Sequence, residues 1–473
     1  MTKTSIMWFR RDLRLTDNQA LHAAIQNSDQ VIFIFIIDPQ QVQNNASVNQ
    51  SAFFASVLHF KETLAKDNVT LLIQNGSVTD VITEIKEAVP SISDIYLNFD
   101  ERGYGRKRDQ QTIRYLSQEL GIVAHPFLDF TLTSASSIKK QDGSAYQIFT
   151  PYYKKWLPSK KDQPLPVLAS TAIRNKQVAK PFEDRIDDLR KLINPNHSYA
   201  YQDSLGEQQA SNTLEDFVSN KLADYDQDRD IPALDGTSHL SRYLRTGEIS
   251  IRTVYDAVNR QPDSLGKETF IKELCWRDFY NMIYTVYPDQ KDQAINTKFQ
   301  SIPWINDEAQ FEAWKNGTTG FPIIDAAMQQ LNQTGWLHNR LRMIVASFLT
   351  KDLLINWTWG EQYFQEKLID YDPASNIGGW QWAASTGTDS VPYFRIFNPF
   401  TQAEKFDPDA KFIKQYIPAL ADLPADKIHH IDRLSEADQQ QYQVILGKDY
   451  PKPIVDHALA RKRAIASYKN LNA

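Results

Sequence analysis

Short apolar runs alternate with longer amphipathic stretches along the first 130 residues of the chain. The runs are five to seven residues long, as buried strands are, and the stretches between them repeat apolar residues at helical spacing. This alternation predicts an α/β domain over residues 1–130, with a doubly wound parallel sheet of five strands. Strands are expected at 5–9, 31–37, 69–74, 94–99 and 122–126, and helices at 18–27, 50–66, 78–88 and 105–120.

The pattern changes after residue 130. Residues 131–202 are rich in Ser, Lys, Pro and Asn, and we interpret them as an inter-domain linker on the surface, partly ordered by the aromatic residues of FTPYYKKW. No strand pattern follows residue 203, and helical spacing dominates to the end, so 203–473 is predicted to be a large all-α domain. Its helices are expected at 206–221, 238–246, 251–258, 268–286, 307–315, 322–334, 338–354 and 360–367.

Residues 370–407 combine acids, amides, tryptophans and cations with few aliphatic residues. Turn signals at Asp372-Pro373 and Gly378-Gly379, together with broken periodicity, predict a long loop inside the helical region. Loops of this kind are usually functional, so we expect an active-site loop; the alternative is a connector with buried aromatic residues. Asp370 and Asp372 have no nearby His or third acid, so a metal site is not expected. Hydrogen bonds from these acids to a ribose, a flavin ring or an Arg fit better.

Composition narrows the function classes. A chain of 473 residues is too long for one core, and 42% hydrophobic with 23% charged residues is typical of soluble globular proteins. The longest apolar run, 31–37, is too short to span a membrane, and the N-terminus has no secretion signal. The single cysteine, Cys275, excludes an internal disulfide and fits the cytoplasm. A net charge of -6 excludes a globally basic nucleic-acid binder but leaves room for a local basic face.

Phosphate-binding signals are weak in the N-terminal part and stronger in the helical part. No GxGxxG follows the first strand and no GxxxxGK[ST] occurs, which disfavours an adenine-nucleotide enzyme that uses the sheet. In DGTSHLSRYLRTG (235–247), the hydroxyl residues Thr237, Ser238 and Ser241 lead a predicted helix, whose free N–H groups can bind phosphate. The alternative is an ordinary helix cap.

Two further helical motifs carry polar faces. In FIKELCWRDFYNMIY (270–284), Glu273, Trp276, Arg277 and Tyr280 lie three and four residues apart and share one face, which suits a flat polar ligand. The alternative is a surface ion pair between Glu273 and Arg277, with Trp276 in the core.

In WLHNRLRMIVASF (336–348), Asn339 and Met343 lie one turn apart with Arg342 beside them, whereas Arg340 points elsewhere, toward a phosphate backbone. The alternative is that His338 and Asn339 cap the helix.

Aromatic residues of the last third leave two interpretations open. Arg395 and Lys405 lie among four aromatic residues, a mixture that suits a nucleic-acid backbone and unstacked bases. Five tryptophans crowd into the same region, and they are either core residues or an electron relay. They are Trp304, Trp357, Trp359, Trp380 and Trp382.

Taken with MWFRRDLRLTDNQAL (7–21), these motifs resemble the DNA photolyase/cryptochrome family over essentially the whole chain, most closely a bacterial class I photolyase for cyclobutane pyrimidine dimers. The resemblance implies an α/β antenna domain, a linker and a helical domain that binds FAD and DNA. It implies light-dependent repair of these dimers in DNA, by electron transfer from excited reduced FAD to the flipped-out dimer. A blue-light receptor of the cryptochrome type is the alternative. A cytoplasmic monomer without membrane association is expected.

The resemblance also assigns residue roles. Cofactor contacts fall on Tyr225, Thr237, Ser238, His239, Leu240, Ser241, Phe270, Arg277, Arg342, Asp370, Tyr371, Asp372 and Asn376. Roles in the repair reaction fall on Glu273, Asn339 and Asn376, with a relay of Trp380, Trp357 and Trp304 from flavin to surface. DNA contacts fall on Arg229, Glu273, Trp276, Arg277, Tyr280, Asn339, Arg340, Met343, Trp382 and Gln402. No metal is implied.

Five positions distinguish subfamilies. The (6-4) photolyases carry His where this chain has Asn339 and Met343, so cyclobutane dimers are the expected substrate. Cryptochromes of plants carry Asp, and those of animals Cys, where this chain has Asn376, and Asn favours the fully reduced flavin that repair needs. Enterobacterial members grip a folate antenna with an Asn-Glu pair where this chain has Tyr104-Gly105. A second chromophore is therefore expected to be a deazaflavin, another flavin or a differently bound folate, and an empty site is the alternative.

Overall fold

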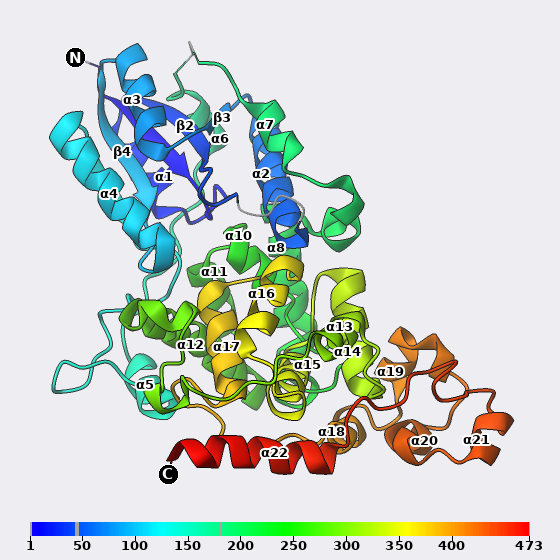
Figure 1. Ribbon diagram of the computed structural model, residues 1–473. Coiled ribbons are helices and arrows are strands. Elements are labelled where there is room, and N and C mark those ends of the chain that lie inside the picture. Colours follow the sequence, from blue (N-terminus) through cyan, green and yellow to red (C-terminus); the bar gives the residue numbers. More distant parts are fainter. Residues whose placement is uncertain (1, 43–46, 179–181, 473) are drawn as a thin grey trace. The chain divides into compact units, whose positions relative to one another are not determined.

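The computed structural model describes residues 2–42, 47–178 and 182–472, which form two compact units (Figure 1). Unit 1 comprises Met1–Tyr146, Thr150–Ala223 and Ser238–Pro288. Unit 2 comprises Gln147–Phe149, Asp224–Thr237 and Asp289–Ala473. The units divide the chain at other points than residues 130 and 202, so the predicted antenna domain, linker and catalytic domain stay a prediction.

A five-stranded parallel sheet with the order β3-β2-β1-β4-β5 forms the centre of unit 1. The order places β1 beside both β2 and β4, which is the arrangement of a doubly wound sheet. The five predicted strands are confirmed to within two residues at each end. They are β1 Thr4–Phe9, β2 Gln30–Ile37, β3 Leu71–Asn75, β4 Ile92–Asn98 and β5 Val123–Phe127.

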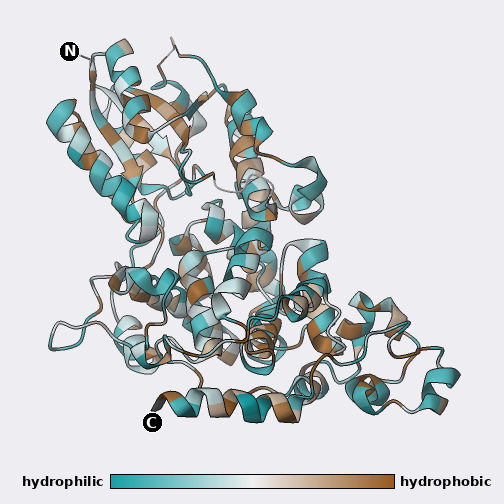
Figure 2. Cartoon of the chain, in the orientation of Figure 1, coloured by the Kyte–Doolittle hydropathy of each residue, from teal (hydrophilic) through white to brown (hydrophobic). Residues whose placement is uncertain are grey.

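Helices cover both faces of the sheet. Alternate residues of each strand point to opposite faces, so each strand contributes side chains to both layers. Met7 and Phe9 of β1 pack with α1 (Gln19–Asn27) and α2 (Val48–Lys66) on one face. Ile6 and Trp8 pack on the other face with α3 (Val78–Ala88) and α4 (Gly103–Glu119). The central strands β1 and β2 are mostly apolar for this reason, and brown is prominent within the sheet (Figure 2). The predicted α/β class is confirmed.

The segment predicted as a linker contributes to the core of unit 1. It contains the short helices α5 (Phe149–Trp156), α6 (Ser170–Arg174) and α7 (Ile186–Lys191). Ile173 and Leu189 are buried with the side chains of α1 and α2. Part of this segment is therefore packed against the sheet rather than lying over the surface.

A buried ionic network joins the segment after residue 238 to the sheet. Arg252 donates hydrogen bonds to Asp17 and Asp129, and Arg14 donates to Asp129. These four side chains are at most 5% exposed. Paired burial of this kind avoids the cost of an isolated buried charge. Four helices predicted to lie in a separate domain belong to unit 1, and the network ties the one that contains Arg252 to it directly. The four helices are α8 Glu207–Asp216, α10 Ser241–Thr246, α11 Ile251–Asn259 and α12 Leu265–Val286.

Unit 2 is helical, as predicted, and the described residues after 203 contain no strand beyond one isolated bridge. The predicted loop at 370–407 is wrong. Asp372 caps α17 (Pro373–Ala384), and α18 (Pro399–Phe406) follows. Asp372-Pro373 is a helix start, not a turn, and Gly378-Gly379 lies within the helix. The other helices are α9 Tyr225–Asp228, α13 Glu308–Asn316, α14 Pro322–Thr334, α15 Asn339–Ser347, α16 Trp357–Lys367, α19 Lys411–Tyr416, α20 Ala425–His429, α21 Glu436–Gln441 and α22 His457–Lys469.

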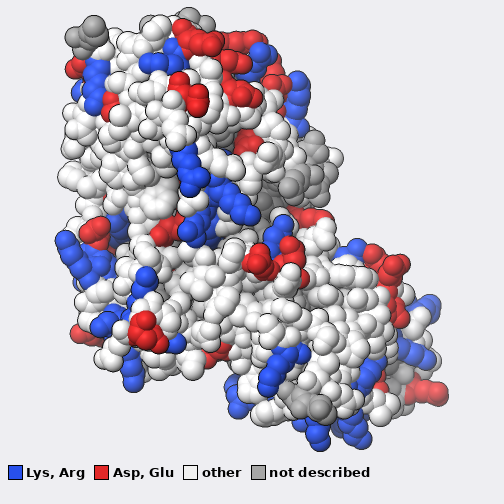
Figure 3. All heavy atoms as spheres, turned by 60° about the vertical axis from the view of Figure 1, so that its left-hand side comes forward, with Lys and Arg blue, Asp and Glu red and all other residues white. Residues whose placement is uncertain are grey.

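Short turns complete unit 2. The predicted helix at 338–354 is α15 continued by a wider π-helical turn, η6 (Phe348–Asp352), and η5 (Thr297–Phe299) is a 3-10 turn. The face drawn in Figure 3 carries both basic and acidic side chains, with a contiguous group of basic ones near its middle. None of the described helices is long and apolar enough to cross a membrane.

Candidate functional site

The accessible face of α12 carries the polar set predicted from the sequence. Glu273, Trp276, Arg277 and Tyr280 are each half-buried, whereas the residues between them are mostly buried. The rings of Trp276 and Tyr280 stack with centroids 5.4 Å apart. The helix therefore presents an acid, a cation and two rings on one side, as the spacing predicts.

Arg277 and Asp278 fix the chain segment that follows β5. The Arg277 guanidinium lies 3.9 Å from the ring centre of Phe130 and donates to the Phe130 carbonyl. Asp278 is buried and accepts from the backbone of Thr133 at 2.9 Å and from the Trp156 indole at 2.9 Å. Burial raises the pKa of Asp278 despite these donors. Sequence reasoning missed Asp278, because an acid beside an Arg resembles a surface ion pair.

The motif at 235–247 begins its helix later than predicted. The predicted start at Ser238 is wrong, because α10 starts at Ser241. The Ser238 hydroxyl accepts from the Leu240 backbone at 3.4 Å, and His239 has a φ of 52°. These residues form a turn before the helix. Thr237, which precedes the turn, belongs to unit 2. Phe270, another predicted cofactor contact, packs on Phe217 with centroids 4.6 Å apart.

In unit 2, Arg342 is held beside Asp370. One terminal nitrogen of Arg342 donates to both Asp370 oxygens, at 3.0 and 2.8 Å, and its Nε donates to the Leu337 carbonyl at 2.8 Å. The Asp370 side chain is 3% exposed and that of Arg342 is 25% exposed. The pair therefore offers guanidinium donors at a partly open position, backed by a buried carboxylate.

A buried acid, Glu361, fixes Asn376. One Glu361 oxygen accepts from the Asn376 amide at 3.1 Å and from the Tyr371 hydroxyl at 2.8 Å. Glu361 is 5% exposed, and burial raises its pKa. The amide nitrogen of Asn376 is turned toward Glu361, so its carbonyl oxygen points the other way. Glu361 was missed in the sequence because nothing in WTWGEQYF marks one acid as buried.

Three predicted relay tryptophans differ in environment. Trp380 is 1% exposed and Trp357 3%, whereas Trp304 is half-buried. Trp380 packs beside Phe364 at 5.0 Å and Trp304 beside Tyr468 at 6.4 Å between ring centres. The gradient from buried to half-buried agrees with a path toward the surface, but the order of the relay stays a prediction.

Other predicted DNA contacts of unit 2 are tied to the chain itself. Arg340 donates to Asp230 at 2.6 Å and stacks over Phe406 at 4.5 Å. Asp230 follows Arg229, whose guanidinium lies 5.2 Å from the Tyr225 ring centre, so α15 and the segment at 224–237 are joined here.

The remaining predicted positions near α15 lie at accessible points. His338 caps α15 by accepting from the Arg340 backbone at 3.2 Å, which confirms the simpler interpretation of His338. Asn339 is exposed and Met343 is half-buried. Trp382 lies 6.5 Å from Phe397, and Gln402 is half-buried on α18.

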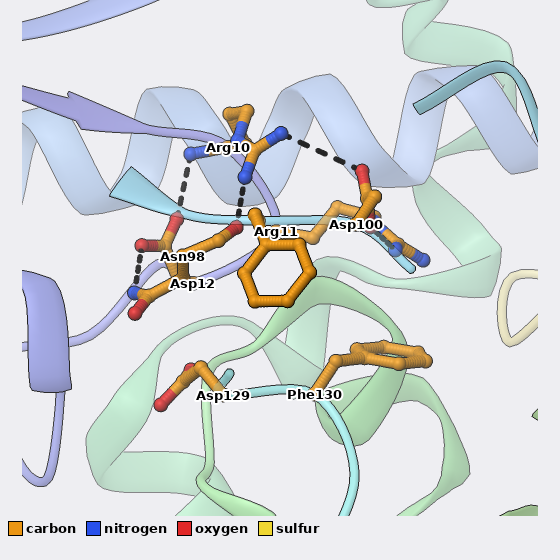
Figure 4. A pocket seen from close by; sticks show the side chains of 8 residues that line it. Arg10, Arg11, Asp12, Asn98, Asp100, Asp129 and Phe130 are labelled. Atoms are coloured by element: carbon orange, nitrogen blue, oxygen red, sulfur yellow. Dashed lines mark hydrogen bonds and ion pairs between the residues drawn. The ribbon is translucent and has the colours of Figure 1, made fainter. Parts of the chain in front are cut away.

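A pocket of about 270 Å³ lies at the carboxyl ends of β1 and β4 in unit 1, where the strand order reverses (Figure 4). Its charges are satisfied internally: Arg10 donates to Asp109 at 2.7 Å, and Asn98 donates to Asp12 at 2.6 Å. Burial alone would raise the pKa of Asp100, but neighbouring arginines hold it well below its usual range. The volume of about 270 Å³ includes space open to solvent, so the enclosed part of the pocket is much smaller.

Tyr104 and Gly105, in the first turn of α4, lie beside this pocket's acids. The Tyr104 hydroxyl donates to Asp38 at 2.6 Å, and a Cβ on Gly105 would lie 2.3 Å from Asp100. Gly105 therefore has no room for a side chain in this conformation. Among the described residues, no group of His, Cys, Asp and Glu side chains could hold a metal ion.

Comparison with known proteins decides the family. Residues 5–169 match the family model described as DNA photolyase, and residues 270–470 match the model described as FAD binding domain of DNA photolyase. A deoxyribodipyrimidine photo-lyase of Alkalihalophilus pseudofirmus is 42% identical over 98% of this chain and 97% of that protein. The chain belongs to the DNA photolyase family. Photolyase structures from other organisms agree in fold as well as in sequence.

A class III photolyase from Agrobacterium tumefaciens has a TM-score of 0.93 at 34% identity, over 100% of this chain and 98% of that one. An archaeal photolyase from Sulfolobus tokodaii with two FAD molecules has a TM-score of 0.85 at 34% identity, over 99% and 100% of the two chains. A cryptochrome from Synechocystis has a TM-score of 0.87 at 28% identity, over 98% and 99%. The residues of unit 2 fit FAD in chemistry, because Asn376 offers a neutral amide and Arg342 a fixed cation.

Proposed function

We propose that this photolyase repairs cyclobutane pyrimidine dimers in DNA in a light-dependent reaction. The observation that carries the proposal is the 42% identity to a deoxyribodipyrimidine photo-lyase along nearly the full length of both chains. Bound FAD in its reduced form, FADH⁻, would supply an electron to the dimer on absorbing light. The absence of a His pair at Asn339 and Met343 supports the cyclobutane dimer as substrate.

Asn376 and Glu361 would set the environment of the cofactor. An Asn side chain has no ionisable proton, so Asn376 neither donates a proton to a reduced flavin nor adds charge beside it. The hydrogen bond to Glu361 keeps the Asn376 amide in one orientation. Arg342, backed by Asp370, would supply a fixed positive charge that favours an anionic reduced cofactor.

The α12 face would receive the lesion. Photolyases act on nucleotides that have left the base stack, and a distorted dimer is cheap to unstack. Trp276 and Tyr280 offer ring surfaces, and the half-buried Glu273 carboxyl offers hydrogen bonding to the dimer. Glu273 would stabilise charge that develops on the dimer. Arg229 and Arg340 would hold phosphates, so affinity is expected to fall with salt.

A second chromophore remains part of the proposal. The similar archaeal structure contains two FAD molecules, which favours a flavin among the candidates over a deazaflavin or a folate. Chromatography of the chromophores released by denaturing the purified protein tests this. One FAD per chain and nothing else would mean that the second site is empty.

The class I assignment stays a prediction, since a class III photolyase structure matches the whole chain. The alternative of a blue-light receptor is supported by the cryptochrome of similar fold. Asn376, in place of the acid or thiol of the plant and animal cryptochromes, favours repair.

Two oligonucleotides, one with a cyclobutane dimer and one with a (6-4) photoproduct, test the substrate. The reduced protein is expected to restore only the first under blue light. Repair of the (6-4) lesion, or of neither, would refute the proposed specificity.

A further inference from the structure

Three segments of unit 2 that are far apart in the sequence meet at an aromatic cluster formed by Phe299, Tyr393 and Tyr468. The Tyr393 and Tyr468 rings stack with centroids 5.8 Å apart and an interplanar angle of 3°. Phe299 lies 6.3 Å from Tyr393 and 5.3 Å from Tyr468. The cluster therefore joins η5, the loop that precedes α18, and the C-terminal helix α22.

The charges on these three segments are all of one sign. Residues 294–306, 391–400 and 457–473 contain six Lys or Arg residues and no Asp or Glu, in a chain whose net charge is -6. Five of the six side chains are exposed, and none has an ion pair within the part of the chain that the structure describes. We call these five the basic face. They are Lys298, Arg395, Arg461, Lys462 and Lys469.

Helical geometry places two α22 members of the basic face, Lys462 and Lys469, on one side of the helix, with Arg461 at its border. At about 100° per residue, Lys462 and Lys469 differ by only about 20° around the helix, and Arg461 lies about 100° from Lys462. The buried residues Ala460 and Ala464 lie about 160° from Lys462, where α22 packs on η6, whereas the buried Tyr468 lies about 20° from Arg461 and borders the basic face. In Figure 1, α22 runs along one edge of unit 2.

Neighbouring carboxylates do not neutralise the basic face. Asp352 is fully buried, and it bonds His457 at 2.5 Å. Asp456 caps α22 by accepting from the Leu459 backbone at 2.9 Å. By contrast, Lys272 on α12 pairs with Glu268 one turn away at 2.7 Å, as an ordinary solvated helix face would.

Lys351 lies against α22 but is buried, so it is not part of the basic face. The Lys351 nitrogen lies 3.7 Å from the ring centre of Tyr468 and donates to the Ser385 hydroxyl at 2.9 Å. Burial lowers the pKa of Lys351 well below its usual range. The positive potential of the surface therefore comes from the five exposed side chains.

We infer that the basic face binds the phosphate backbone of the DNA duplex beside the lesion, as an extension of the DNA site along α22. The inference rests on the proposed function, because Arg395 and the exposed Phe394 lie on the loop that the sequence assigns to DNA, and Tyr393 stacks that loop on α22. A helix of 13 residues is about 20 Å long, which corresponds to about six base pairs of duplex. The extension therefore needs a duplex arm of that length on one side of the dimer.

The double variant Arg461→Gln/Lys462→Gln tests the inference, with Lys66→Gln/Lys107→Gln on α2 and α4 as the control of equal charge change. The affinity for DNA is measured at several salt concentrations. Each duplex carries a cyclobutane dimer, and the base-paired arm on one side of the dimer is either short, about 4 base pairs, or long, about 16 base pairs; a second set varies the arm on the other side. Each lost phosphate contact reduces the slope of log affinity against log salt by about 0.9. The test variant should lose about 1.8 of slope, and affinity roughly tenfold or more, only with the long arm on one side.

The experiment distinguishes failure of the basic face as a DNA site from failure of the proposed repair function. Equal binding of variant and wild type to every duplex, or an equal loss with short arms and in the control, would overturn the basic face as a DNA site. The yield of repair at saturating enzyme should be the same in variant and wild type, because α22 carries no proposed catalytic residue. If light repairs no dimer even with the wild type, the proposed function fails, whereas the dependence on arm length still tests the basic face.

Discussion

Replacement of Glu361 tests how unit 2 orients Asn376. One buried oxygen of Glu361 accepts from the Tyr371 hydroxyl at 2.8 Å and from the Asn376 amide at 3.1 Å. Leucine at this position leaves both donors without that acceptor, and each unpaired buried donor costs about 1–3 kcal/mol. The free energy of unfolding should therefore fall by about 1–3 kcal/mol for the buried Tyr371 hydroxyl, less the cost of the buried charge that leucine removes. The half-buried Asn376 adds less, because its amide also donates to the backbone carbonyl of residue 361 at 3.4 Å.

Glutamine is the matched control, because Glu361→Gln keeps an acceptor oxygen while removing the charge. Burial raises the pKa of Glu361, so the ionised carboxylate is unfavourable in the fold. We expect the glutamine variant to stay within about 1 kcal/mol of wild type. Adding Tyr371→Phe to the leucine variant removes the hydroxyl donor that leucine leaves without its acceptor. The loss of unfolding free energy in the double variant should therefore be about 1–3 kcal/mol smaller than the sum of the losses in the two single variants.

Urea unfolding of the FAD-bound protein measures these differences from the midpoint and the slope. The sign of the pH dependence follows from the raised pKa: the folded protein holds the Glu361 proton more tightly than the unfolded chain does. The stability of wild type relative to the glutamine variant should therefore fall as pH rises from the ordinary pKa of a glutamate through the raised value. Equal stability of the leucine and glutamine variants, with no coupling to Tyr371→Phe, would refute the idea that Glu361 holds Asn376.

Three further changes have separate readouts. Glu273→Ala should lower the yield of dimer repair while FAD stays bound, and an unchanged yield would remove its proposed role. Trp304→Phe should block photoreduction of oxidised FAD but spare repair by pre-reduced protein; loss of both would count against the relay. Burial raises the pKa of Asp325 to about 6, so wild-type stability relative to Asp325→Asn should fall by up to about 3 kcal/mol between about pH 4 and pH 6. A flat difference in unfolding free energy over that range would contradict the raised pKa.

The sheet and the α12 face could be predicted from the sequence because local patterns report them. Strands covered on both faces are apolar throughout, so β2 is visible as an uninterrupted run. On α12, spacings of three and four residues place Glu273 and Trp276 on one side whatever lies around the helix.

Features that depend on tertiary contacts could not be predicted in this way. Helix α17 has few aliphatic residues, and its Gly pair resembles a turn, yet the helix forms because Asp372 caps it and Trp380 is buried. Glu361 becomes buried only through packing with Tyr371 and Asn376, and nothing in its own neighbourhood marks it. Arg252 likewise pairs with acids more than 120 residues away, so its place in unit 1 has no local signal.

Light-dependent repair is the central claim, and a direct comparison tests it. The purified protein, with its flavin reduced under anaerobic conditions, is mixed with an oligonucleotide that carries one cyclobutane thymine dimer. One half of the mixture is kept dark, the other half receives blue light, and the remaining dimers are counted by chromatography. We predict intact thymines in the illuminated half only. Equal dimer content in the two halves would contradict the account.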